Sequence, residues 1–339
     1  MRDISLVKIL PVEPRLPIMK WRRITGIISV VAILFSIFEF FYHGLDYGID
    51  FTGGVVTVVD FGGEPPANVQ DFVQSQFPGS VVQNISQPPG AEVTYDYVRI
   101  GLPLQAEPDD AVSDVVTESA DGTETRSQQT DAQQIAQGEL LNALRGEFGD
   151  VRIDATETVS GKVSGELRRK GTIAVLLALG LVLGYIWFRF EWQFGAGAIA
   201  ALLHDVILTI GVFCIVDLEF NLAIIAAILT IVGYSLNDTV VVYDRIRENL
   251  RKYKKMPLEE VIDISINDML SRTILTSVTT LLALTALYFL GGPGLEGFSF
   301  AMIWGVIVGT YSSIFVASPM LMALKLKRGS RIDSTTTKA

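Results

Sequence analysis

Six apolar stretches, each long enough to cross a lipid bilayer, constrain this chain more than any other feature of its sequence. A helix needs about 20 consecutive apolar residues to span the hydrocarbon core. The stretches that meet this length are residues 24–43, 171–190, 196–216, 221–243, 273–291 and 298–322. A mean hydropathy of +0.40 and a charged fraction of 19% are typical of membrane proteins. The sequence therefore predicts a polytopic α-helical membrane protein with six transmembrane helices.

Basic residues give the expected orientation of these helices. Lys and Arg concentrate in the N-terminal segment 1–23 and in the segment that follows residue 243, whereas the connections 217–220 and 291–297 contain none. Because short loops rich in Lys and Arg stay in the cytoplasm, we expect both 1–23 and the tail 325–339 there. The length of the first apolar stretch, and its lack of a small-residue cleavage site, favour a retained anchor over a signal peptide.

The long segment between the first two apolar stretches, residues 44–170, is expected to be an exported domain. It alternates strand-like and helical patterns in the order βαββαβ, which is that of a ferredoxin-like α+β domain. The predicted strands are 55–61, 80–86, 92–102 and 151–160, and the predicted helices are 65–77 and 131–148. An acidic stretch rich in Ser and Thr, about 105–130, predicts a disordered insert in this domain.

Three shorter patterns complete the predicted architecture. Pro257 and an apolar face predict an amphipathic helix over 257–271, along the cytoplasmic membrane surface. The glycines of GIDFTGG (48–54) are expected to turn the chain from the first membrane helix into the first strand, because no GK[ST] of a phosphate loop follows. Close helix packing is predicted at Gly180–Gly184, Gly305–Gly309 and residues 195–201.

Ionisable residues inside the apolar stretches are the candidate functional groups. An Asp near the middle of a bilayer costs roughly 2.5 to 3.5 kcal/mol on insertion. Asp238 lies in the fourth stretch, about 9 Å from its cytoplasmic end at a rise of about 1.5 Å per residue. His204 and Asp205 lie in the third stretch, and Arg272 lies at the start of the fifth.

The neighbours of Asp238 supply possible partners. Tyr234 and Ser235 lie one helical turn away and could offer hydroxyls to the same face, and Asn237 is adjacent. The short connection between the fourth and fifth helices makes them plausible neighbours, so Arg272 is the natural counter-charge for Asp238.

Two interpretations of these charges stay open. They could fasten helices together, although polar contacts between membrane helices average only about 0.6 kcal/mol. Alternatively, they could form a proton or cation path, in which the departure of Arg272 makes Asp238 take up a proton. Each charge that crosses the membrane potential yields about 2.3 kcal/mol per 100 mV, enough to bias a conformational equilibrium.

Other classes of function are poorly supported. The single cysteine, Cys214, permits no disulfide within the chain, and two histidines leave little scope for a metal centre. No nucleotide-binding loop and no nucleophile with a base is evident, so the sequence predicts neither an enzyme nor a bound cofactor or metal. A nucleic-acid partner is not expected either, and energy must come from a gradient or a partner protein.

Seven motifs, spread in order over essentially the whole chain, indicate a family. They are GIDFTGG (48–54), FRFEW (188–192), HDV (204–206), GYSLNDTVVVYDRIREN (233–249), SRTILTS (271–277), GGPGLEGFS (291–299) and GTYSSIFVASP (309–319). Together they closely resemble the SecF family of the bacterial SecDF protein-export complex. The acidic insert departs from the shorter exported domains expected for that family.

The resemblance implies more than the residue pattern does. It implies half of a transporter of the resistance-nodulation-division superfamily, whose six helices pair with six of a SecD partner in the bacterial cytoplasmic (inner) membrane. It also implies association with the SecYEG channel and use of the proton motive force to complete export of unfolded polypeptides after the SecA ATPase. Asp238 and Arg272 match the functional aspartate and arginine of the family, and His204 and Asp205 match a motif given a supporting role. The expected coupling ion is H⁺, with Na⁺ left open.

Three other functions are compatible with parts of the sequence. An exporter of small molecules or lipids from the same superfamily fits less well, because six helices with one modest exported domain do not make a self-sufficient exporter. A membrane-anchored sensory module is disfavoured by the intramembrane charges. A purely structural subunit of a translocase stays open.

Overall fold

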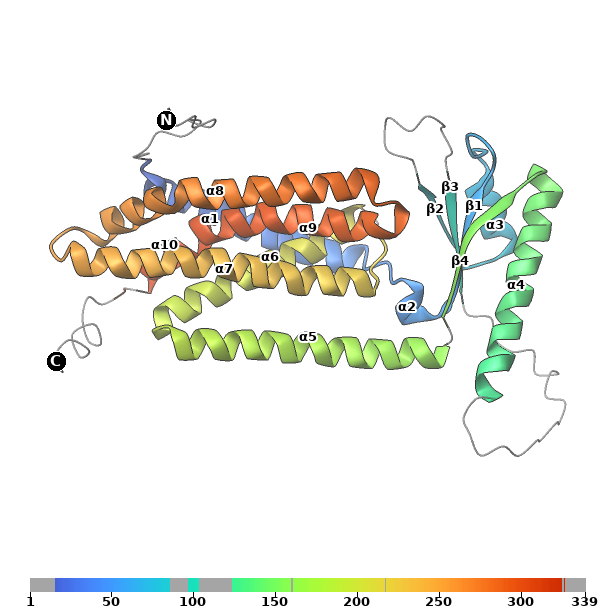
Figure 1. Ribbon diagram of the computed structural model, residues 1–339, viewed down its shortest axis with the longest axis horizontal. Coiled ribbons are helices and arrows are strands. Elements are labelled where there is room, and N and C mark those ends of the chain that lie inside the picture. Colours follow the sequence, from blue (N-terminus) through green and yellow to red (C-terminus); the bar gives the residue numbers. More distant parts are fainter. Residues whose placement is uncertain are drawn as a thin grey trace, which may run out of the picture.

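The computed structural model describes residues 16–85, 97–103, 124–159, 161–216, 218–324 and 326. A long helical bundle carries a small sheet domain at one end (Figure 1). Within the described residues, six helical segments are long and apolar enough to cross a membrane, as predicted. These are α1 (Arg22–Tyr42), α5 (Gly161–Arg189), α6 (Trp192–Val216), α7 (Leu222–Lys252), α8 (Leu258–Leu290) and α9 (Pro293–Ser312) with its continuation.

The last segment is one helix with a change of pitch. After α9 the chain passes through a π-helical turn, η2 (Ser313–Ala317), and continues as α10 (Ser318–Ala323). Helices α6, α7 and α9 pack against one another at the centre, and α1 packs on α6. Helix α5 lies along the outside of the bundle with few of its residues buried (Figure 1). The polar groups of interest lie on the central three helices and on α8.

Helix α8 corrects one prediction. The sequence indicated a surface helix at 257–271 followed by a separate membrane helix at 273–291, but the structure has one helix, Leu258–Leu290. No Gly or Pro lies inside it, so nothing breaks the backbone where the hydropathy changes. The predicted apolar face exists, but Ile262 and Ile266 are buried in a protein core with Met19 of the short 3₁₀ helix η1 (Ile18–Trp21) rather than in lipid.

The sheet domain has the predicted order of elements. It comprises β1 (Gly54–Asp60), α3 (Val69–Gln76), β2 (Val81–Ile85), β3 (Tyr97–Pro103), α4 (Glu124–Phe148) and β4 (Arg152–Val159). The strands lie in the order β2-β3-β1-β4, and every neighbouring pair is antiparallel. This is the split βαβ arrangement of ferredoxin-like domains. Helices α3 and α4 bury Val73, Leu140 and Leu144 against Val59 and Ile100 of the sheet.

Several predicted boundaries of this domain were wrong or lie outside the described residues. The helix predicted for 131–148 begins at Glu124, because residues 124–130 include good helix formers and no Gly or Pro. The predicted insert therefore ends earlier, and residues 104–123 lie outside the described part. The first half of the predicted strand 92–102 also lies outside it. Residues 161–170, assigned to the exported domain, belong to helix α5.

Glycines form one turn and one close helix contact that the sequence predicted. Gly53 and Gly54 have φ of +72° and +134°, which lets the chain turn from the short helix α2 (Ile49–Thr52) into β1. A Cβ on Gly305 would lie 2.3 Å from Ile231 Cγ1, so the backbone of α9 packs directly against the Ile231 side chain of α7. The Gly180–Gly184 prediction fails in the described structure, because no atom of another segment lies within 4 Å of a Cβ at either position.

These glycines give a matched test of the packing. We expect Gly305→Ala to destabilise the protein by about 1–3 kcal/mol, because Ile231 is buried and has no room to move away. Gly180→Ala fills open space in an exposed helix position and should be neutral, or stabilising by up to about 1 kcal/mol. Thermal unfolding in detergent would measure both variants, and equal melting temperatures would contradict the packing described.

Candidate functional site: polar groups within the helix bundle

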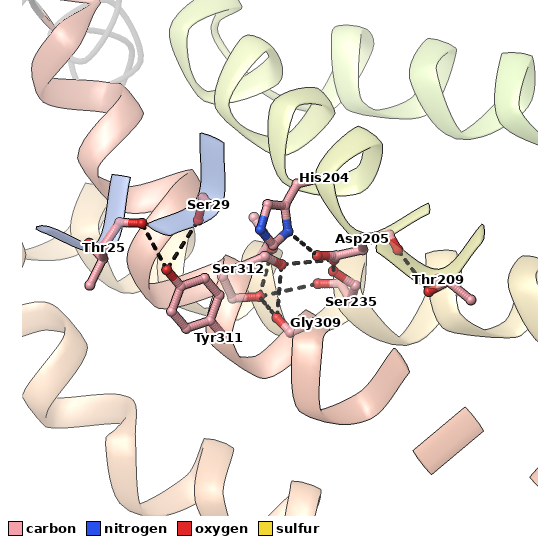
Figure 2. A network of polar contacts seen from close by, with 11 residues as sticks. Thr25, Ser29, His204, Asp205, Thr209, Ser235, Gly309, Tyr311 and Ser312 are labelled. Atoms are coloured by element: carbon pink, nitrogen blue, oxygen red, sulfur yellow. Dashed lines mark hydrogen bonds and ion pairs between the residues drawn. The ribbon is translucent and has the colours of Figure 1, made fainter. Parts of the chain in front are cut away.

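Asp205 is the centre of a buried network that joins three helices (Figure 2). The residue is fully buried, at 0% exposure. Its Oδ2 accepts hydrogen bonds from Ser235 Oγ of α7 at 2.5 Å and from Ser312 Oγ of α9 at 2.8 Å. Its Oδ1 lies 2.9 Å from Nδ1 of His204, which must donate because an ionised carboxylate only accepts. Both carboxylate oxygens are thus satisfied without water.

His204 extends this network toward α1. Its ring stacks on Tyr311, with centroids 5.9 Å apart. The Tyr311 hydroxyl donates to the backbone oxygen of Thr25 at 3.0 Å and lies 3.1 Å from Ser29 Oγ (Figure 2). His204 Nε2 is buried and has no hydrogen-bond partner among the described residues. The first membrane helix is therefore tied to the same polar layer as Asp205.

Two adjacent serines, at the junction of α9 with the π-helical turn η2, serve different partners. Ser312 donates to Asp205, while Ser313 lies 2.9 Å from the Thr239 hydroxyl of α7 and donates to the backbone oxygen of Gly309. Ser318 Oγ donates to the Ser313 backbone oxygen, five residues earlier, across the widened turn. Such single π turns occur often at functional sites. The turn thus connects the surroundings of Asp205 with the helix that carries Asp238.

Asp238 has a different environment from Asp205. Its side chain is only partly buried, and Oδ1 accepts one hydrogen bond, from Thr273 Oγ1 of α8, at 2.9 Å. Its Oδ2 is buried and has no hydrogen-bond partner among the described residues. The Ser313 hydroxyl lies near the same carboxylate, and its closest hydrogen-bond partners are the Gly309 backbone oxygen and the Thr239 hydroxyl, each at 2.9 Å. One oxygen of an intramembrane carboxylate is therefore left without a donor.

Arg272 does not pair with Asp238 in the described residues, although the sequence made it the natural counter-charge. Helices α7 and α8 are neighbours, as predicted. Adjacent helical residues point about 100° apart, so Thr273 faces α7 and Arg272 is exposed on the open side of α8. Thr273 takes the position next to Asp238 that the sequence assigned to Arg272.

The predicted hydroxyl partners of Asp238 are also corrected. Ser235 donates to Asp205, because α6 packs against that side of α7, and the Tyr234 hydroxyl donates to Ser277 Oγ at 3.4 Å. Asn237 is exposed. By contrast, Asp244 pairs with Arg189 at 3.4 Å in a half-exposed position, as expected for a charge at the membrane edge.

Several residues of the site were not identified from the sequence. They are Ser312, Ser313, Tyr311 and Thr273. A signal was present in the motif GTYSSIFVASP, where hydroxyl residues recur within one turn of an apolar helix. Nothing in a single helix, however, indicates which neighbour its hydroxyls bind. Among the residues that the structure describes, no cluster of three or more His, Cys, Asp or Glu could hold a metal ion.

Comparisons with known proteins identify the family. Residues 139–327 match the family model described as protein export membrane protein SecD/SecF, C-terminal. The protein translocase subunit SecF of Rhodobacter capsulatus is 37% identical over 95% of this chain and 92% of its own length. The SecF of Vibrio alginolyticus is 38% identical over 95% and 94%. The longer SecDF of Brucella abortus is 41% identical over 95% of this chain and 39% of its own.

Solved structures agree with these relatives. A crystal structure of SecDF from Thermus, described as a translocon-associated membrane protein, superimposes with a TM-score of 0.76 at 35% identity, over 94% of this chain. A SecDF in a super-membrane-facing form gives a TM-score of 0.62 at 37% identity, over 93% of this chain. This chain spans 40% and 39% of those two chains. The chain therefore belongs to the SecF family of protein-export membrane proteins.

Proposed function

We propose that this chain is the SecF subunit of a protein translocase and works with a SecD partner as an ion-driven motor. Support comes from SecF relatives that match it over almost their whole length. Relatives named SecDF contain an equivalent of this chain within a longer polypeptide, which supports a SecD partner. Within this proposal the SecYEG channel and the SecA ATPase are further partners, and unfolded exported polypeptides are the substrates.

The observation that carries the motor role is the incomplete hydrogen bonding of Asp238. A carboxylate oxygen that is buried without a donor is costly, and protonation removes the charge that makes it so. In this proposal the ionised Asp238 attracts Arg272, and the protonated form releases it. The described arrangement, with Arg272 exposed and unpaired with Asp238, corresponds to the released end of the cycle. We take H⁺ as the coupling ion, and Na⁺ is the alternative that the experiment below distinguishes.

The open face of α7 and α8 supports a membrane partner at this position. Asn237 and Arg272 are exposed within helices that are otherwise suited to lipid. Polar groups in membrane-spanning helices normally face other protein or a water-filled cavity, because lipid offers them no partner. A SecD half that covers this face would enclose Asp238 and Arg272 at the interface. Within this proposal, the sheet domain lies on the outer side of the bacterial cytoplasmic membrane, and both termini lie in the cytoplasm.

Replacement of Asp238 tests the motor role. In proteoliposomes with SecD, SecYEG and SecA, Asp238→Asn should abolish export driven by an imposed proton gradient after ATP is exhausted, a loss of at least about tenfold on the scale of essential proton-transfer groups. Proton flux should fall with it, and a sodium gradient in the same vesicles shows which ion drives export.

Asp244→Asn is the matched control, since it removes a carboxylate from the same helix at the membrane edge. It should export like the wild type. Normal gradient-dependent export by Asp238→Asn would refute the motor role and leave a structural subunit as the better description.

A second, structural role is favoured for Asp205. Both of its oxygens are satisfied, by donors from its own helix α6 and from α7 and α9, and it is fully buried. A buried carboxylate with donors from three helices holds those helices together. We therefore propose that Asp205 fastens the bundle against which Asp238 moves.

Stability measurements separate the two carboxylates. Asp205→Ala leaves the buried donors of His204 and Ser235 without an acceptor, at roughly 1–3 kcal/mol each before relaxation, so its melting temperature in detergent should fall strongly. Asp238→Ala leaves one buried donor, Thr273, without its acceptor but also removes a buried oxygen that has no donor, so its melting temperature should change much less. An Asp205→Ala protein that melts like the wild type would rule out the fastening role.

A further inference from the structure

The exported domain meets the helix bundle at a small joint, formed by residues 46–52 and 219–222. Helix α2 lies in this joint, between the bundle and the sheet (Figure 1). The backbone of Phe220 makes a two-hydrogen-bond bridge, in which its N–H donates to Asp46 O at 2.7 Å and its oxygen accepts from Gly48 N at 2.9 Å. The Phe220 ring stacks on Phe51, with centroids 6.0 Å apart. Two segments far apart in sequence are thus held as one piece.

Asp50 attaches this joint to the start of α7. Its Oδ2 accepts the N–H of Leu222, the first residue of that helix, at 2.9 Å. The first amides of a helix have no partner within the helix, and a carboxylate there also complements the helix dipole. Asn221, the N-cap residue, serves Ile224 N with its own side chain. Asp50, which lies three residues before the turn into β1, therefore caps one free amide of α7.

Arg99 attaches the joint to the sheet. Its guanidinium pairs with Glu219, and the two side chains are only 22% and 13% exposed. Burial raises the pKa of the Glu219 carboxyl above its ordinary value, while Arg99 opposes that shift. Loss of Arg99 would therefore leave a buried carboxylate that is costly to keep ionised. Arg99 lies on β3, which pairs along its length with β1.

Among the described residues, helix α2 of the joint also packs against α5. Cavities of about 270 and 400 Å³ flank the joint, between the open face of the sheet and the adjoining ends of the helices. The other connection runs from β4 into α5, a helix that carries neither Asp205 nor Asp238. Helix α7, by contrast, carries Asp238 sixteen residues beyond Leu222, about 24 Å along a continuous helix.

We propose that the joint is the mechanical link through which Asp238 moves the exported domain, with Asp50, Arg99 and Glu219 as its positioning residues. The inference rests on the proposed function, because it assumes that α7 shifts when Asp238 changes its charge. Any such shift displaces the amide that Asp50 holds, and with it the segment that enters β1. The joint plays no part in ion binding.

Charge exchange across the ion pair tests this link. Arg99→Glu and Glu219→Arg each place like charges together, whereas the double variant restores an ion pair of opposite sense. In full-length protein with SecD, SecYEG and SecA in proteoliposomes, each single variant should lose at least about tenfold of gradient-driven export, and the double variant should recover most of it. Proton flux through the complex should stay near wild type in all three.

A distance measurement reads the motion directly. Spin labels at Gln74 of α3 and Arg251 of α7, both exposed, can be placed in a Cys214→Ala background. The distance should change with pH in the wild type and in the double variant, but not in the single variants. If the single variants fail to fold, Asp50→Ala against Asp50→Asn serves the same purpose, because Asn keeps an acceptor for Leu222 N.

The outcomes separate this inference from the function on which it rests. Asp238→Asn with normal flux and export refutes the proposed motor. If Asp238→Asn loses both while the joint variants export normally, the joint alone is refuted. Loss of proton flux in the single joint variants, or failure of the double variant to recover export, also overturns the link.

Discussion

The hydrogen bonds that Ser235 and Ser312 donate to Asp205 fix the centre of this protein. Because a bilayer offers no water to satisfy polar groups, a buried carboxylate must collect its donors from neighbouring helices. Here the donors come from three helices, and this requires close approach. Gly309 provides it, since a Cβ there would lie 3.0 Å from Ser235 Cβ. At the start of the π turn that follows, Ser313 lies beside Thr239 of α7.

The two carboxylates of the bundle illustrate how burial and function diverge. Asp205 is more deeply buried than Asp238, yet it is the better satisfied of the two. The cost of inserting a carboxylate into a membrane depends on its depth, so this cost does not show which of the two has which role. Their hydrogen bonds do distinguish them, since both oxygens of Asp205 have donors whereas Oδ2 of Asp238 has none among the described residues. This difference supports the division of roles between a fastening group and a coupling group.

Sequence patterns predicted the six membrane helices and the βαββαβ order, because both depend on periodicity within one segment. The failures concern contacts between segments. Ser235 was assigned to Asp238 by its helical spacing, but the packing of α6 gives it to Asp205. Arg272 was assigned as a counter-charge by sign, but rotation about α8 presents Thr273 instead. The break predicted before residue 273 followed hydropathy, whereas helix continuity depends on the backbone and on the absence of Gly and Pro.

The continuous helix α8 also has a consequence for how the protein is made. At 33 residues it is about 50 Å long, well beyond the roughly 30 Å of a hydrocarbon core. Its first turns hold the chain just before α1, through Asn267 with Leu16 and Asp263 with Met19. Those partners are synthesised more than 240 residues after the segment they hold. During biogenesis the first helix therefore enters the membrane with its flanking segment unanchored, and Met19 becomes fully buried only once α8 has emerged.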